Sequence, residues 1–139
     1  MLSYVYFGTN NLDKAIAFYD AVLAPLGMAR CVTRDPAWDR IAAGWGIYEG
    51  DGARELAFWI GKPFNEQIAS AGNGSMVAFS ASSWEAVDTF HAAALANGGA
   101  CEGAPGLRLQ YSTDFYASYV RDPDGNKVAA VCRGITAPR

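Results

Sequence analysis

The sequence predicts an α+β fold made of two βαβββ modules, and three observations support this. A strand, a helix and further strands occur twice in the chain, at an offset of 72 residues. The first helix carries an apolar stripe, and the chain ends in a clear β-hairpin. Each module alone would expose a hydrophobic face that the other can cover, so the repetition indicates one domain. We place module one at about residues 1–62, a linker at about 63–74 and module two at about 75–133.

The first module begins with a strand over residues 2–8, which are rich in aromatic and β-branched side chains. Apolar residues then recur at helical spacing from Leu12 to Leu26, which predicts a helix of about four turns. This helix opens at Thr9-Asn10-Asn11 and ends at Gly27 as a left-handed cap. Three further strands are predicted over residues 28–33, 41–48 and 55–60.

The second module repeats this pattern. A strand is predicted over 76–79, and a helix begins at Ser82-Ser83, runs through Leu95 and is closed by Gly98-Gly99. Ser82 and Glu85 match the Ser-x-x-Glu capping box, whose side chains satisfy free amides at a helix start. Matching residues at the 72-residue offset include Val5 and Val77, Phe7 and Phe79, Phe18 and Phe90, Leu23 and Leu95, and Gly27 and Gly99.

The closing hairpin is predicted from two β-rich runs, 115–121 and 127–132, on either side of Asp122-Pro-Asp-Gly-Asn126. Proline presets one turn dihedral and glycine accepts a positive φ. Asp122 and Asp124 resemble a pair of catalytic carboxylates. We interpret them as turn formers, because aspartate stabilises such turns by accepting hydrogen bonds from nearby amides.

Composition excludes several classes of protein. The 139 residues are 51% hydrophobic and 18% charged, which is typical of one globular domain. The net charge is −3 with no cluster of Lys or Arg, so we expect no nucleic-acid or membrane partner. There is no signal peptide pattern and no apolar run of about 18 residues, which predicts a cytoplasmic protein. Cys31, Cys101 and Cys132 lack disulfide or zinc spacing and are expected to be buried thiols.

Two such modules, together with the runs Asn11-Leu-Asp-Lys-Ala-Ile-Ala-Phe-Tyr-Asp-Ala-Val-Leu23 and Tyr119-Val-Arg-Asp-Pro-Asp-Gly-Asn-Lys127, resemble the vicinal oxygen chelate superfamily. That group includes glyoxalase I, extradiol dioxygenases, and fosfomycin- and bleomycin-resistance proteins. The resemblance covers nearly the whole chain. It implies helices outside curved mixed sheets that enclose a cavity, and a homodimer that sometimes exchanges modules. In the enzymes it implies a divalent metal between the modules, held by His or Glu on the first and last strands of each.

The metal positions implied by the resemblance do not carry metal ligands in this sequence. The family motifs place them on Tyr4, Met76 and Ala129, and the 72-residue offset relates Ala129 to Ala57. Alanine offers no donor, and methionine is too soft for the ions that these enzymes use. A slip of one residue would bring Glu55 or Lys127 inward, but it would also turn every side chain to the opposite face. We therefore expect no metal or other cofactor.

Other catalytic groups are scarce. His91 is the single histidine and lies in the middle of the second helix, so we expect it on a helix flank and not in a catalytic site. No Gly-x-Ser-x-Gly elbow and no phosphate-binding loop occurs. Arg108 is the only cation that we expect near the cavity mouth, where it would pair with an anionic group or remain a solvated loop residue.

Aromatic residues are the main candidates for ligand binding. Residues two apart in a strand point to the same side of the sheet. In the four predicted strands this groups Tyr4 with Tyr6, Ala57 with Trp59, Met76 with Ala78 and Ser80, and Ala129 with Val131. By the metal-position argument these faces point into the cavity. Phenol and indole groups there would orient a flat or partly apolar small molecule. Further candidates, which are otherwise core aromatics, are Trp45, Tyr111, Tyr116 and Tyr119.

Two functions are consistent with these residues. The first is a metal-free protein that binds a small aromatic or amphipathic molecule between the modules, as bleomycin-resistance proteins do. The alternative is a relative of glyoxalase-like lyases or dioxygenases that uses a displaced metal, or Tyr4 or Tyr6 as an acid or base. Such a base would need a pKa lowered far below the usual value of about 10. A third hypothesis is a structural subunit that binds no ligand and whose cavity has collapsed.

Overall fold

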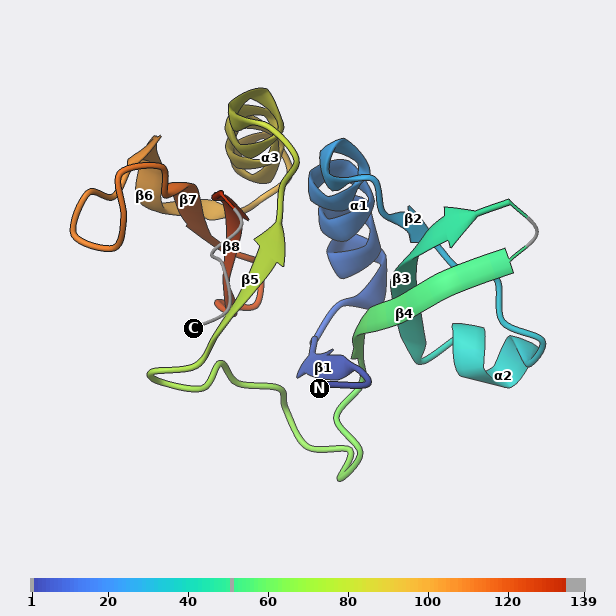
Figure 1. Cartoon of the computed structure of the whole chain (residues 1–139). Coiled ribbons are helices and arrows are strands. Elements are labelled where there is room, and N and C mark those ends of the chain that lie inside the picture. Colours follow the sequence, from blue (N-terminus) through green and yellow to red (C-terminus); the bar gives the residue numbers. More distant parts are fainter. Residues whose placement is uncertain (1, 51, 135–139) are drawn as a thin grey trace.

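The chain forms two four-stranded mixed sheets with helices, as a computed structural model shows (Figure 1). The structure describes residues 2–50 and 52–134, with only the backbone for 49 and 52–57. Helices α1 (Leu12–Leu23) and α3 (Trp84–Ala96) each cover one face of a sheet and pack against each other near the middle of the molecule. The described strands do not close into a barrel. The predicted α+β class with two modules is confirmed.

The first module holds the sheet β1-β4-β3-β2, in which β1 is parallel to β4 and the other pairs are antiparallel. The strands are β1 (Val5–Gly8), β2 (Ala29–Arg30), β3 (Ala42–Glu49) and β4 (Gly52–Gly61). Helix α1 begins because the Asn11 side chain accepts a hydrogen bond from the Lys14 amide over 3.1 Å. A short 3-10 turn, η1 (Ala24–Leu26), extends it, and Gly27 ends it with a φ of 78°.

One predicted strand of the first module is wrong in length. The strand expected over 28–33 contracts to β2, and the chain then forms the short helix α2 (Pro36–Asp39). The Asp35 side chain caps this helix by accepting from the Ala37 amide over 2.9 Å. Aspartate before a proline at the first helical position is a helix start as well as a turn signal, and here the helix forms.

The second module has the same topology, with the sheet order β5-β8-β7-β6. Its strands are β5 (Met76–Ser80), β6 (Ala100–Leu107), β7 (Tyr116–Arg121) and β8 (Lys127–Cys132). The predicted hairpin is confirmed, with Gly125 at a φ of 89°. Asp122 accepts from the amides of Asp124 and Asn126 over 2.9 Å each, as expected of a turn former. Residues 62–75, between the two sheets, form neither helix nor strand.

The predicted capping box of the second helix is wrong by one residue. Ser83 and not Ser82 is the cap, and its hydroxyl accepts from the Ala86 amide over 3.1 Å. Glu85 then lies one position too early to complete the box. Ser83 corresponds to Asn11 at the 72-residue offset, so the two helices are capped at equivalent positions.

The repeat is shorter by two residues at the last strand of each module. Val5 pairs with Phe58, whereas its counterpart Val77 pairs with Val128, so these strands are related by 70 residues and not 72. The structural counterpart of Ala129 is therefore Trp59 and not Ala57. A shift of two residues keeps each side chain on the same sheet face.

The core lies where the helices meet the sheets and is shared by both modules. Phe18 of α1 and Phe90 of α3 are fully buried in it. The rings of Phe58 and Phe79, one from each sheet, meet edge to face with centroids 5.2 Å apart. Of the helices that the structure describes, none is long and apolar enough to cross a membrane.

Candidate functional site

The face of the second sheet that α3 leaves uncovered carries several predicted ligand-binding residues. Ala78 pairs with Ala129, and Ala129 pairs with Tyr119, so these three residues form one row across β5, β8 and β7. Met76 lies two residues before Ala78 and is 45% exposed. Side chains on the opposite face of the same strands pack in the core, among them Val77, Phe79, Val128 and Ala130. Strand alternation therefore separates the core from the open face.

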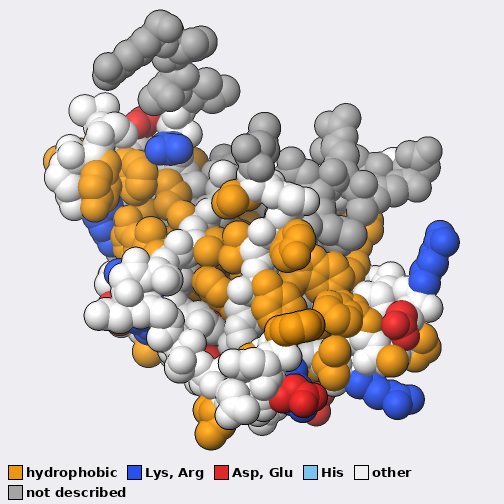
Figure 2. Space-filling view, turned by 90° about the horizontal axis from the view of Figure 1, so that it is seen from below, with side chains coloured by type: hydrophobic (Ala, Val, Ile, Leu, Met, Phe, Trp, Pro, Cys, Tyr) orange, Lys and Arg blue, Asp and Glu red, His pale blue; other side chains and the backbone are white. Residues whose placement is uncertain are grey.

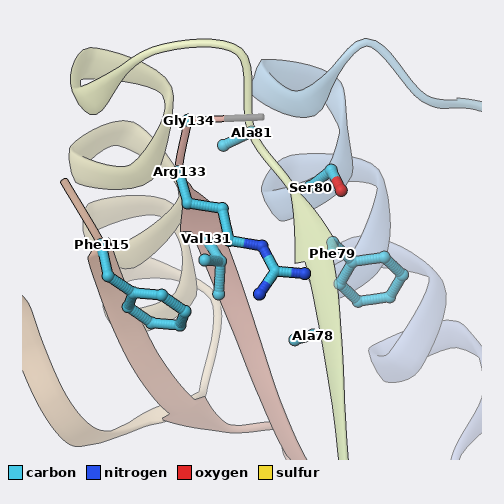
Figure 3. A pocket seen from close by; sticks show the side chains of 8 residues that line it. All are labelled: Ala78, Phe79, Ser80, Ala81, Phe115, Val131, Arg133 and Gly134. Carbon is cyan, nitrogen blue, oxygen red and sulfur yellow. The ribbon is translucent and has the colours of Figure 1, made fainter. Parts of the chain in front are cut away.

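A hollow of about 410 Å³ lies at the end of this face where β8 leaves the sheet. Figure 3 shows the Arg133 side chain reaching from β8 past Val131 towards β5, with Phe115 on its other side. Arg133 and Phe115 were missed by the sequence analysis. Arg133 follows Ala129 and Val131 at two-residue steps, so strand alternation carried the signal for it.

Two further hollows, of about 400 and 370 Å³, are both lined by Met76, Tyr111 and Tyr119, and the smaller of them shares Phe115 and Arg133 with the first. These three predicted residues are thus brought together, with Tyr111 65% exposed. The Arg108 guanidinium carbon is 5.4 Å from the centroid of the Tyr119 ring, and the Lys127 ammonium is 5.5 Å from it. The expectation of Arg108 as the only cation near the site is therefore wrong, because Lys127 and Arg133 line the same face.

The open face of the first sheet is aromatic. Tyr6 on β1 pairs with Trp59 on β4, and Tyr4 precedes β1 with 61% of its surface exposed. Trp59 lies over Gly44 on β3, where a β carbon would come within 2.7 Å of the indole ring. The Trp38 ring of α2 meets Trp59 at a centroid distance of 6.3 Å. Glycine at position 44 thus makes room for the indole.

Tyr6 has the wrong environment for a catalytic base. Its hydroxyl donates to the Lys62 carbonyl oxygen over 2.8 Å, and burial raises its pKa above the ordinary value. A general base would need the opposite shift.

Trp45 does not join the aromatic residues on the open face. It is fully buried on the helix side of β3, against Tyr19 and Phe58, and its indole N–H donates to Asp20 over 3.0 Å. Tyr116 also lies on the helix side, where it stacks on Trp84. Trp45 pairs with Phe58, the neighbour of Trp59, and Tyr116 is three residues from Tyr119 on β7. Because side chains alternate between the two faces of a sheet, both residues point to the face opposite Trp59 and Tyr119. The side chains of Ala57 and Glu55 fall outside the described residues.

His91 lies on the α3 side, as expected, and not on the open faces. Its Nε2 atom is 3.2 Å from the Cys101 sulfur. Burial lowers the pKa of His91 although the Asp88 carboxylate acts in the opposite direction. The expectation of buried thiols is wrong for Cys101, which is exposed, whereas Cys31 and Cys132 are half-buried.

The donor set does not fit the divalent metal that the superfamily's enzymes hold. Tyr4, Met76 and Ala129 occupy three of the implied positions and offer a phenol, a thioether and a methyl group. In the part of the chain that the structure describes, no group of three His, Cys, Asp or Glu residues converges. No step of a reaction can be assigned to a metal at these positions.

Each hollow described above is lined by residues of one module. Tyr6 and Trp59 are on the first sheet and Tyr4 directly precedes it, whereas Met76 and Ala129 are on the second sheet. Figure 2 shows hydrophobic side chains gathered over the middle of the face seen from below, the side on which β1 lies in Figure 1. A monomer thus presents open apolar faces.

Comparison with known proteins agrees with this architecture. The model of the Glyoxalase/Bleomycin resistance protein/Dioxygenase superfamily matches residues 2–130. The crystal structure of a glyoxalase/bleomycin resistance protein from Albidiferax ferrireducens T118 is 39% identical, with a TM-score of 0.76 over 96% of this chain and 99% of that one. No curated protein sequence matches the chain.

Two more distant structures share the fold. The fosfomycin resistance protein FosX from Listeria monocytogenes is 17% identical, with a TM-score of 0.64 over 97% of this chain and 94% of that one. Lactoylglutathione lyase from Agrobacterium tumefaciens is 20% identical, with a TM-score of 0.58 over 95% of this chain and 92% of that one. The family match, which spans nearly the whole chain, means that this protein belongs to the Glyoxalase/Bleomycin resistance protein/Dioxygenase superfamily.

Proposed function

We propose that this protein is a metal-free member of the superfamily that binds a small aromatic or amphipathic molecule on the open faces of its sheets. The observation that carries the proposal is the pairing of Tyr6 with Trp59 on one face and the row of Ala78, Ala129 and Tyr119 on the other. Tyr6, Trp59 and Tyr119 offer ring surfaces and Ala78 an exposed apolar side chain, whereas Ala129 is fully buried. Such surfaces favour flat, partly apolar ligands that a few polar groups orient.

A homodimer is part of this proposal. Tyr4 and Met76 expose large apolar side chains, and the hollows of one chain are each lined by a single module. Hydrophobic side chains gather on the face seen in Figure 2, and contiguous exposed apolar patches mark interaction surfaces in folded proteins. A second copy that brings its first sheet against the second sheet of its partner would enclose a cavity between two aromatic faces. The proposed location of the protein is the cytoplasm.

The alternative, a lyase or dioxygenase relative, has less support. The similarity to lactoylglutathione lyase is 20% in sequence and concerns the fold. The raised pKa of Tyr6 opposes its use as a base, and Tyr4, Met76 and Ala129 oppose a metal at the usual positions.

The neutral fluorescent dye N-phenyl-1-naphthylamine can test the proposal. We expect metal-stripped protein to bind it, and Trp59→Ala to weaken binding about tenfold, because the variant loses one aromatic wall. Trp84→Ala is the matched control, since Trp84 stacks on Tyr116 on the helix side. Binding that requires added metal, or that both variants weaken equally, would count against the proposal.

A further inference from the structure

The geometry points to an anion-binding site in the hollow lined by Arg108, Lys127 and Tyr119, which would take the acidic group of an aromatic carboxylate, sulfonate or phosphate. This inference rests on the proposed function, because it names the chemical class of the ligand that the open face would accept. The ring of that ligand would lie against Met76 and Tyr111, which line the same hollow.

Arg108 is held in place with donors to spare. Its Nη1 donates to the Gly106 carbonyl oxygen over 2.9 Å, and its Nη2 donates to the Ala104 carbonyl oxygen over 2.7 Å. A guanidinium has five N–H donors, so these two bonds fix its plane without using up its capacity. The carbonyl oxygens are neutral, so they do not compensate the charge of the guanidinium. None of the ion pairs among the described residues includes Arg108. A positioned guanidinium of this kind suits a carboxylate or phosphate.

Lys127 brings a second positive charge to the same ring. Its ammonium and the Arg108 guanidinium each lie within 5.5 Å of the Tyr119 ring centroid. The ring attracts both cations, but the cations repel each other. An anion in the hollow that both residues line would offset this repulsion, which gives it an advantage over a neutral ligand of the same shape.

The acidic residue in the hollow does not cancel these charges. Glu102 already pairs with Arg121, whose Nε is 2.7 Å from its carboxylate. The hollow is therefore lined by two basic groups, Arg108 and Lys127, and by one acidic group whose charge Arg121 neutralises, in a chain whose net charge is −3. A local excess of positive charge in a concave site attracts anions from solution.

The size of the hollow agrees with a small organic acid. Its volume is about 400 Å³, and the adjoining hollow shares Met76, Tyr111 and Tyr119 and is also lined by one further basic residue, Arg133, and one acidic residue, Asp114. Volumes of roughly 300–1,000 Å³ are typical of sites for small molecules. The polar end and the apolar wall of the site are thus next to each other, as an aromatic acid requires.

A pair of dyes with the same ring system tests the inference. 8-Anilinonaphthalene-1-sulfonate is anionic and N-phenyl-1-naphthylamine is neutral, and their dissociation constants would be measured by fluorescence titration at low salt. We expect the sulfonate to bind more tightly than the neutral dye. Lys127→Gln and Arg108→Gln should each weaken sulfonate binding roughly fivefold and leave the neutral dye unchanged. Glu102→Gln should strengthen sulfonate binding by a similar factor. Lys14→Gln, at an exposed position on α1, is the control with the same change of net charge.

The outcomes separate the inference from the proposed function. If neither dye binds, both fail. If the neutral dye binds as tightly as the sulfonate and the charge variants change neither affinity, the anion site is excluded and the proposed function survives. An equal loss of sulfonate binding in Lys14→Gln would also exclude the site, because the effect would then come from net charge. Arg108 bonds the Gly106 and Ala104 carbonyl oxygens, so Arg108→Gln could disturb the local backbone. In that case the result for Lys127→Gln still decides the test.

Discussion

The hydroxyl of Tyr19 donates a hydrogen bond to the buried carboxylate of Asp122 over 2.7 Å, and this bond joins helix α1 of the first module to the closing turn of the second. The same turn bonds the start of α1, where the Asn10 amide donates to Asp124 over 2.9 Å. Asn126 donates to the Gly8 carbonyl oxygen over 3.3 Å. The turn residues thus hold the two modules together in addition to shaping the hairpin.

Removing the Tyr19 hydroxyl should destabilise the protein. We expect Tyr19→Phe to lower the free energy of unfolding by about 1–3 kcal/mol, because a buried carboxylate loses a hydrogen-bond donor. Urea denaturation would measure this. The control is Tyr116→Phe, which removes a hydroxyl that bonds the exposed Asp88 over 2.7 Å and should cost less. If both variants lost the same free energy of unfolding, the bond between the modules would contribute no more to stability than an exposed hydrogen bond.

A side chain at position 44 should displace Trp59. The β carbon of Gly44→Ala would lie 2.7 Å from the indole ring, and we expect a loss of about 1–3 kcal/mol. The double variant Gly44→Ala, Trp59→Ala tests the cause, because without the indole the added methyl group has room. Denaturation of the four proteins gives a coupling energy. Strictly additive effects would mean that the two residues do not conflict.

The helix cap of α3 distinguishes two neighbouring serines. Ser83→Ala should cost about 1 kcal/mol because the Ala86 amide loses its acceptor, whereas Ser82→Ala should cost much less. Thermal or urea unfolding of the two variants would measure the difference. A larger loss for Ser82→Ala would restore the capping box that the sequence suggested.

Acid should remove the contribution of the pair formed by Glu102 and Arg121. The hydrogen bond and charge of Arg121 hold the pKa of Glu102 below its ordinary value of 4.5. A carboxyl with a lowered folded pKa stabilises the protein above its unfolded pKa and loses that effect as the pH falls through the folded value. Glu102→Gln should therefore lower the melting temperature at about pH 7 and not at about pH 3. A difference that persists at low pH would contradict this.

Chelation should leave the protein unchanged. Tyr4, Met76 and Ala129 cannot form a site for a hard divalent ion, so EDTA treatment should alter neither the melting temperature nor the binding of N-phenyl-1-naphthylamine. Elemental analysis of the purified protein before treatment completes the measurement. Stoichiometric zinc, nickel, iron or manganese that EDTA removes with a loss of stability would overturn the proposal of a metal-free site.

The sequence by itself determined the two-module α+β fold, because local signals agree with each other. The helical stripe after Asn11, the glycine at position 27 and the turn at Asp122–Asn126 each act over a few residues. The choice between Ser82 and Ser83, and the short helix α2, depended on geometry that a propensity pattern does not resolve.

Only the tertiary structure decided which residues share the open faces. Alternation along the strands predicted that Met76, Ala78 and Ala129 share one side of the second sheet, and they do. Trp45 instead points to the core, because the pairing of β3 with β4 places it beside the buried Phe58. The grouping of Arg108 and Lys127 around Tyr119 also required the fold. Residues far apart in the chain meet only when strands pair, and pairing register follows from the packing of the whole sheet.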